Sequence, residues 1–128
     1  QEYFSRYHTY FELLLSEYFE NGRFETTLRR TEQLISPYVK KDPTAFCSFT
    51  DHQVAVDTLE QVCLLRAQSI RSQLEGEIPS TIRGQAEQPK AKVDASMIHL
   101  EELGDFDDLR TSKKRQEAAL NQINKQEA

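Results

Sequence analysis

Large apolar side chains recur at helical spacing through the first twenty residues. Successive members are three or four positions apart, which is the repeat of one face of an α-helix. Polar residues such as Arg6 and Glu12 fall between them, and Asn21-Gly22 then supplies a left-handed stop. We therefore expect an amphipathic helix over about residues 2–20, with a broad stripe formed by Tyr3, Phe4, Tyr7, Tyr10, Phe11, Leu14, Leu15 and Tyr18.

Two further helices are expected before Gly76. The second runs over about residues 23–36, where Pro37 either kinks it or follows Ser36 as the cap of a new turn. The third covers about residues 51–75, because Thr50 and Gln53 have the spacing of a capping box. Its apolar positions are Val56, Leu59, Val62, Cys63, Ala67, Ile70 and Leu74.

The character of the chain changes after Gly76. Residues 77–104 contain few periodic apolar positions, and we expect an extended segment in which residues 83–92 form a loop. A small apolar segment of Met97, Ile98, Leu100 and Leu103 is expected to dock on the helices. Residues 105–128 form a polar tail, either frayed or helical.

The predicted fold is therefore all-α. Residues 1–76 form a three-helix antiparallel, bundle-like core, followed by an irregular C-terminal extension. Eleven of the twelve Phe and Tyr residues lie in residues 1–49, so the packed core is expected within the first 76 residues.

Composition limits the possible functions. The chain of 128 residues has a net charge of −5, which argues against a nucleic-acid partner because such proteins normally present a basic face. No apolar run is long enough for a membrane span, and no signal peptide is visible. The chain begins with Gln1 and its only methionine is Met97, so we expect it to start inside a longer protein.

No residue pattern predicts catalysis, a cofactor or a metal in this chain. The four glycines are far apart, unlike a phosphate-binding loop. The histidines His8, His52 and His99 lie in three separate segments without metal-ligand spacing, and no nucleophile elbow is present. Asp105-Phe106-Asp107-Asp108 lacks the glycine and glutamate of a calcium loop, so a solvated acidic turn is the better interpretation.

Several side chains leave alternatives open. Cys47 and Cys63 are free thiols or a disulfide pair. Arg66 and Arg71 lie on the third helix, and Arg66 falls in the buried register, where its head group could meet a carboxylate. Lys113-Lys114-Arg115 is a solvated helix face or a docking patch. The tyrosines of the first helix pack in the core or face a neighbour outside this chain.

Three stretches together resemble the C-terminal part of the CotH kinase family, the spore-coat protein H-like atypical kinases. They are residues 34–46 (LISPYVKKDPTAF), 66–81 (RAQSIRSQLEGEIPST) and 93–96 (VDAS). The similarity extends from about Tyr7 to Leu103, and the tail after Asp105 matches nothing familiar.

The resemblance implies the end of the large lobe of a protein-kinase-like fold. Members of the family bind ATP with a divalent metal, phosphorylate protein serines and are spore-associated or exported. Their phosphate-contacting and metal-binding residues lie upstream of the matched stretches, so none transfers to a position in this chain. The implied partner is therefore the rest of a parent kinase, with this chain supporting the catalytic lobe and offering a docking surface for substrate.

An alternative is a stand-alone helical module that binds another protein through the aromatic face of the first helix. Both hypotheses require that face to be accessible. Burial of Tyr3, Tyr7 and Tyr10 within this chain would contradict an outside neighbour.

Overall fold

All regular structure in the described part of the chain is helical. The computed structural model describes residues 2–104, and it contains no strand within that range. The all-α prediction is confirmed. The elements are α1 (Glu2–Leu14), the π-helix η1 (Leu15–Phe19), α2 (Arg23–Val39), α3 (Phe49–Leu74), α4 (Ile82–Glu87) and the 3-10 helices η2 (Pro89–Ala91) and η3 (Leu100–Leu103).

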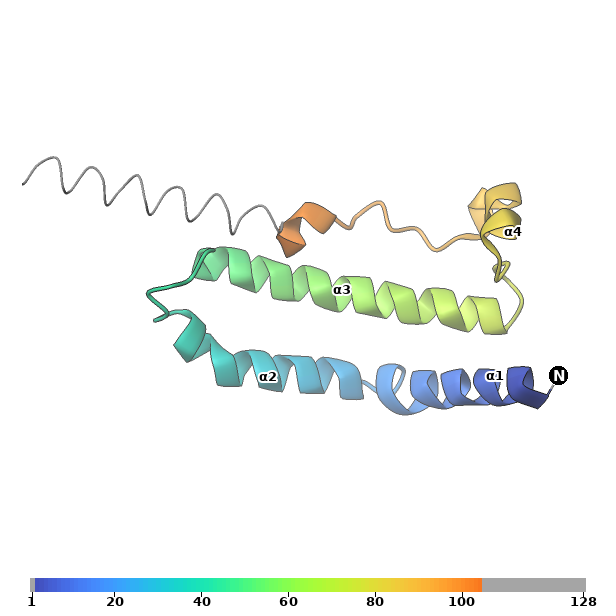
Figure 1. The fold of residues 1–128 in the computed structure, drawn as a ribbon, viewed down its shortest axis with the longest axis horizontal. Helices are drawn as coiled ribbons and strands as arrows, with labels where there is room; N and C mark the ends of the chain where they lie inside the picture. The colour runs from blue at the N-terminus through green and yellow to red at the C-terminus, as the bar shows by residue number, and fades with distance from the viewer. Residues whose placement is uncertain (1, 105–128) are drawn as a thin grey trace, which may run out of the picture.

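The three long helices form two antiparallel arms. Helices α1 and α2 lie end to end in one arm, and α3 runs back beside both of them (Figure 1). Each of α1 and α2 contacts α3, whereas these two helices make no contact with each other. Residues 77–104, which we call the return segment, then run back along the other side of α3 (Figure 1). The helix α3 is therefore the central element of the fold.

The junction between α1 and α2 has the predicted glycine stop and an unpredicted π-helix. The Glu20 amide donates to the Leu15 carbonyl oxygen at 2.8 Å, a five-residue span that defines the wider turn. The Asn21 side chain donates to the Glu17 carbonyl oxygen at 2.7 Å. Gly22 then adopts a φ of 76°, a conformation that favours glycine, and α2 starts at the next residue.

The second helix ends later than predicted. It passes through Pro37 and ends at Val39, so Ser36 does not cap a new turn. The Ser36 hydroxyl instead donates to the Glu32 carboxylate at 2.5 Å, and the Ser36 carbonyl accepts from the Lys40 amide at 2.9 Å. Proline is tolerated because it removes only one hydrogen bond, near the helix C-terminus.

The third helix begins earlier than predicted, and the predicted capping box was wrong. The cap is Ser48, whose hydroxyl accepts from the Asp51 amide at 3.1 Å. The Asp51 carboxylate in turn accepts from the Ser48 amide at 3.0 Å. Thr50 and Gln53 have the same sequence spacing, but they lie inside the helix.

The return segment contains a short helix where a loop was predicted. Helix α4 begins after Thr81, whose hydroxyl accepts from the Gly84 amide at 3.1 Å. Gly84 is required here, because a Cβ at this position would lie 2.7 Å from the Pro79 Cβ. The Gln85 side chain also donates to the Pro79 carbonyl oxygen at 2.8 Å, which closes the turn.

The core is small and is not confined to residues 1–76. Leu15 is 1% exposed and Ile78 is 3% exposed, while Ala67 and Thr58 are the other buried side chains of the described region. Ile78 belongs to the return segment, outside the expected core. In the apolar segment that was expected to dock, η3 contacts α3, although Met97, Leu100 and Leu103 are exposed.

Candidate interaction surfaces

Helix α3 has two opposite faces that are covered by different parts of the chain. Residues 60, 63, 67 and 71 share one face, and residues 58, 62, 65 and 69 share the other, because 3.6 residues make one turn. Glu60 and Arg71 contact the α1–α2 arm, whereas Thr58 contacts Glu102 of the return segment. The sequence prediction placed Val62 in one apolar stripe with Cys63 and Ala67, whereas Val62 lies on the second face.

Two arginines fix the first face of α3 to the arm. The Arg71 guanidinium donates two hydrogen bonds to the Glu20 carboxylate, at 2.7 and 3.0 Å, and lies 3.5 Å from Glu12. The hydrogen bonds from Arg71 to Glu20 raise the pKa of the guanidinium further above its ordinary value. Further along, Arg29 of α2 donates to Asp57 at 2.7 Å and also pairs with Glu60. The arm is thus held on both sides of Gly22.

Arg71, and not Arg66, provides the predicted arginine–carboxylate contact. Arg66 lies about a third of a turn away from the face of α3 that meets the arm. Its side chain is exposed and makes no ion pair with any residue in 2–104. The buried register assigned to Arg66 was therefore wrong.

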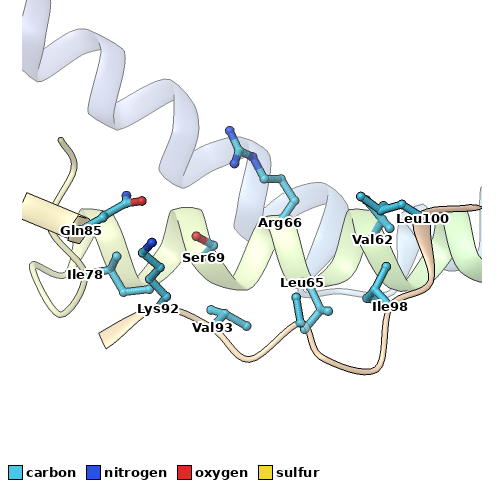
Figure 2. A pocket seen from close by; sticks show the side chains of 11 residues that line it. Val62, Leu65, Arg66, Ser69, Ile78, Gln85, Lys92, Val93, Ile98 and Leu100 are labelled. Carbon is cyan, nitrogen blue, oxygen red and sulfur yellow. The ribbon is translucent and has the colours of Figure 1, made fainter. Parts of the chain in front are cut away.

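The second face of α3 is only partly covered. The return segment is fixed near one end by the buried Ile78 and near the other by the Thr58 hydroxyl, which donates to the Glu102 carboxylate at 2.5 Å. Between these points a groove of about 580 Å³ lies between α3 and residues 78–100 (Figure 2). We call this the α3 groove.

The lining of the α3 groove is apolar with a positive rim. Val62, Leu65 and Ile98 are among its apolar residues, and Arg66 and Lys92 are its charged ones (Figure 2). No carboxylate belongs to the lining, although Asp and Glu outnumber Lys and Arg in the chain by 21 to 16. The groove can therefore accept an apolar group that bears negative charge.

The outer side of α1 presents a second candidate surface. Tyr3, Tyr7 and Tyr10 are 87%, 57% and 69% exposed, and Leu14 continues the same helical row. We call these four residues the α1 stripe. The neighbouring row, which contains the buried Leu15, contacts α3 through η1. The expectation that Tyr3, Tyr7 and Tyr10 are not buried within this chain is confirmed, whereas Tyr18 is half-buried against Phe24.

The histidines and cysteines do not converge on a site. The His8 ring lies against the Phe4 ring at a tilt of 46°, His52 stacks on Phe49, and His99 lies 3.4 Å from Glu101. Cys47 is exposed in the loop before α3, whereas Cys63 is half-buried on the helix. About 21 Å of helix separates Phe49 from Cys63, which excludes a disulfide between the two cysteines in this fold. Burial raises the pKa of the Cys63 thiol, which keeps it protonated.

No metal site or membrane helix occurs in the part of the chain that the structure describes. No three His, Cys, Asp or Glu side chains within residues 2–104 are grouped as metal ligands would be. None of the helices in this range combines the length and apolar character needed to cross a bilayer. The acidic turn at 105–108 and the basic cluster at 113–115 lie outside the described residues.

A comparison with protein-family models identifies the family of this chain. The family model described as CotH kinase protein matches residues 1–70, more than half of the chain. The chain belongs to the CotH kinase family. Comparisons with curated proteins and with solved structures found no match.

The CotH match covers the α1–α2 arm and most of α3. The stretch 34–46 that suggested the family lies inside the matched residues, the stretch 66–81 lies partly inside, and the stretch 93–96 lies outside. The α1 stripe belongs entirely to the matched CotH region. The α3 groove is formed jointly by matched residues of α3 and by the return segment beyond them.

Sequence reasoning found the α1 stripe but missed the α3 groove. The stripe has a regular helical repeat, which is the strongest signal in a single sequence. The groove depends on where an irregular segment crosses a helix, which no local pattern specifies. The available signal was a second apolar register on α3, at Val62 and Leu65, together with Val93 and Ile98 in the segment that follows.

Proposed function

We propose that this CotH chain is the C-terminal helical region of a CotH-like protein kinase. Its role is to support the catalytic lobe by packing the α1 stripe against it. The observation that carries the proposal is the exposure of Tyr3, Tyr7 and Tyr10 at 87%, 57% and 69%. Contiguous exposed aromatic side chains are typical of a surface that another structure covers.

We assign phosphoryl transfer to the parts of the parent kinase that lie outside this chain. Phosphoryl transfer needs a phosphate-binding element, a lysine and carboxylates that hold a divalent metal. Residues 2–104 contain no cluster of three metal-ligating side chains, and Gly22, Gly76 and Gly84 are far apart in sequence. We therefore assign ATP and its metal to other parts of the parent kinase, and the proposed contribution of this chain is structural support, with presentation of substrate as a further role.

The test compares two variants of the full-length parent protein. Replacing Tyr3, Tyr7 and Tyr10 by Ser should lower both the thermal midpoint and ATP-dependent serine phosphorylation, because the lobe loses its packing partner. Tyr38→Ser is the matched control, since Tyr38 is 75% exposed but lies on α2. Unchanged activity and midpoint in the triple variant would contradict the proposal.

A second candidate is a stand-alone module that binds another protein through the same α1 stripe. It rests on the same exposure of aromatic side chains, which are enriched at protein interfaces. The open reading frame separates the two candidates. A nucleotide-binding lobe encoded directly before Gln1 supports the kinase proposal, whereas a start codon or an unrelated domain at that position supports the module.

A further inference from the structure

We propose that the α3 groove binds an acidic, extended peptide segment of a partner protein. The proposal does not rest on the kinase assignment, because the groove lies on the face of α3 opposite the α1–α2 arm. Three features of the groove support it: the charges at its rim, the apolar surface inside it, and the free backbone of the return segment beside it.

The rim charge selects a negatively charged occupant. Arg66 and Lys92 line the groove and make no ion pair with any other residue of the described chain. Most other arginines of the described region behave differently: Arg6, Arg29, Arg71 and Arg83 all pair with carboxylates. A positively charged rim without a carboxylate, in a chain of net charge −5, favours acidic groups by charge complementarity.

The interior of the groove requires that the acidic occupant also carries apolar groups. Val62, Leu65 and Ile98 form an apolar surface on the side of Arg66 that faces away from Lys92 (Figure 2). The volume of about 580 Å³ lies within the range of sites that hold a small ligand or the side chains of a short peptide. Burial of leucine- or phenylalanine-sized side chains there would supply affinity, while the carboxylates would meet the rim.

The backbone beside the groove favours a peptide over an acidic amphiphile. Lys92 is extended, with φ −67° and ψ 149°, and the next residues belong to no helix. The backbone amide and carbonyl groups of Val93 and Asp94 make no hydrogen bond with other residues of 2–104. Such groups can pair with an added strand, whereas a fatty acid offers them no matching row of donors and acceptors.

The first experiment measures binding of a labelled synthetic peptide to the 128-residue chain by fluorescence anisotropy. The peptide alternates Leu and Phe with Asp and Glu, and a comparison peptide has Lys in place of the acidic residues. The acidic peptide should bind, with an affinity that falls as salt is added, and the basic peptide should not. Equal binding of the two peptides would overturn the proposal.

The second experiment tests the rim. Arg66→Glu combined with Lys92→Glu should weaken binding of the acidic peptide by about tenfold or more. The control combines Arg30→Glu with Lys41→Glu, which changes two exposed cations of the same types outside the groove and should leave the affinity within about twofold. Circular dichroism checks that both variants fold, and an equal loss in both would contradict a groove-specific effect.

Hydrogen exchange separates the peptide from other ligands without any substitution. Bound peptide should slow exchange of one of the Val93 and Asp94 amides, which are both unpaired in the free chain, because successive amides of an extended segment point to opposite sides. Oleate serves as the competing acidic amphiphile. Displacement of the peptide by oleate at lower concentration, or peptide binding that protects neither amide, would overturn the assignment to an extended peptide.

Discussion

The two faces of α3 are covered in different ways. Against the α1–α2 arm, the buried Leu15 of η1 lies in sequence between Glu12 and Glu20, the two partners of Arg71 from the arm, and Arg29 forms a second contact further along the arm. Against the return segment, Ile78 and the Thr58–Glu102 hydrogen bond hold the two ends and leave the α3 groove between them. Two helices with matching repeats can cover each other continuously, whereas a helix and an irregular segment meet at separate points.

From this difference we infer that the face of α3 toward the arm stabilises the fold, whereas the face toward the return segment binds a partner. The arm should unfold together with α3, because α1, η1 and α2 each contact α3 and the ion pairs of Arg29 and Arg71 join them on both sides of Gly22. The return segment should be able to open by itself, because it has only short helices of its own and is held mainly near its two ends, by Ile78 and by the Thr58–Glu102 hydrogen bond. Four variants or conditions test the distinction, in decreasing order of expected effect.

Leu15→Ala should destabilise the whole helical hairpin. Leu15 is 1% exposed, and truncation of a fully buried leucine costs about 3 kcal/mol of unfolding free energy. Urea denaturation followed by far-UV circular dichroism measures the loss. Leu13→Ala is the control, because Leu13 is 54% exposed and its replacement should cost about 0.5 kcal/mol or less. Equal losses in the two variants would refute a core centred on Leu15.

Ile78→Ala should release the return segment while the hairpin stays folded. The side chain is 3% exposed, so the substitution should cost about 2 kcal/mol in local opening. Hydrogen exchange should accelerate at the Ile98 amide, which donates to the Ala95 carbonyl oxygen at 3.0 Å. Amides in the middle of α3 should keep their protection. Loss of protection in both regions together would show that the two faces are not independent.

Arg71→Met should cost less than either core substitution and should depend on salt. The Arg71 side chain is 23% exposed but its partners Glu20 and Glu12 are 48% and 59% exposed, so solvent screens the ion pairs. We expect a loss of about 1 kcal/mol at low ionic strength that shrinks in high salt. Arg6→Met, which removes an exposed pair within α1, is the control and should have almost no effect. A loss that is independent of salt would indicate that packing, and not charge, explains the effect.

Acid should loosen the first turn of α3 before it affects the rest of the helix. Hydrogen bonds from the Ser48 hydroxyl and amide lower the pKa of Asp51 below its ordinary value of about 3.9. A lowered pKa means that the stabilisation is complete above this ordinary value and is lost as the pH falls through the folded value. NMR titration of the Asp51 carboxyl together with exchange of its amide measures the change. Asp51→Asn should abolish this dependence, and the same pH response in that variant would contradict the assignment.

The sequence predicted the helices better than their ends and their packing. The three- and four-residue repeat predicted the helical region of α1 and η1, and Gly22 predicted the break after it. Both signals depend only on local backbone geometry. The cap of α3 was misplaced because Ser48–Asp51 and Thr50–Gln53 have the same spacing, and only the position of the preceding loop distinguishes them. The end of α2 was misplaced because a proline in the last turn removes only one hydrogen bond.

The two candidate surfaces also differ in how far the sequence predicts them. The α1 stripe follows from the repeat of one helix, and its exposure was a stated expectation that the structure confirms. The α3 groove brings Arg66 together with Lys92, which is 26 positions later in the sequence. No local rule relates two such positions, and the assignment of Arg66 to the core failed for this reason.

The exposure of the tyrosines determines how this chain can be observed by optical spectroscopy. The chain contains no tryptophan, and Tyr3, Tyr7, Tyr10 and Tyr38 are 87%, 57%, 69% and 75% exposed. Tyrosine fluorescence therefore reports mainly on the outer surface of the arm. Unfolding should change this emission only slightly, whereas a protein that covers α1 should change it strongly.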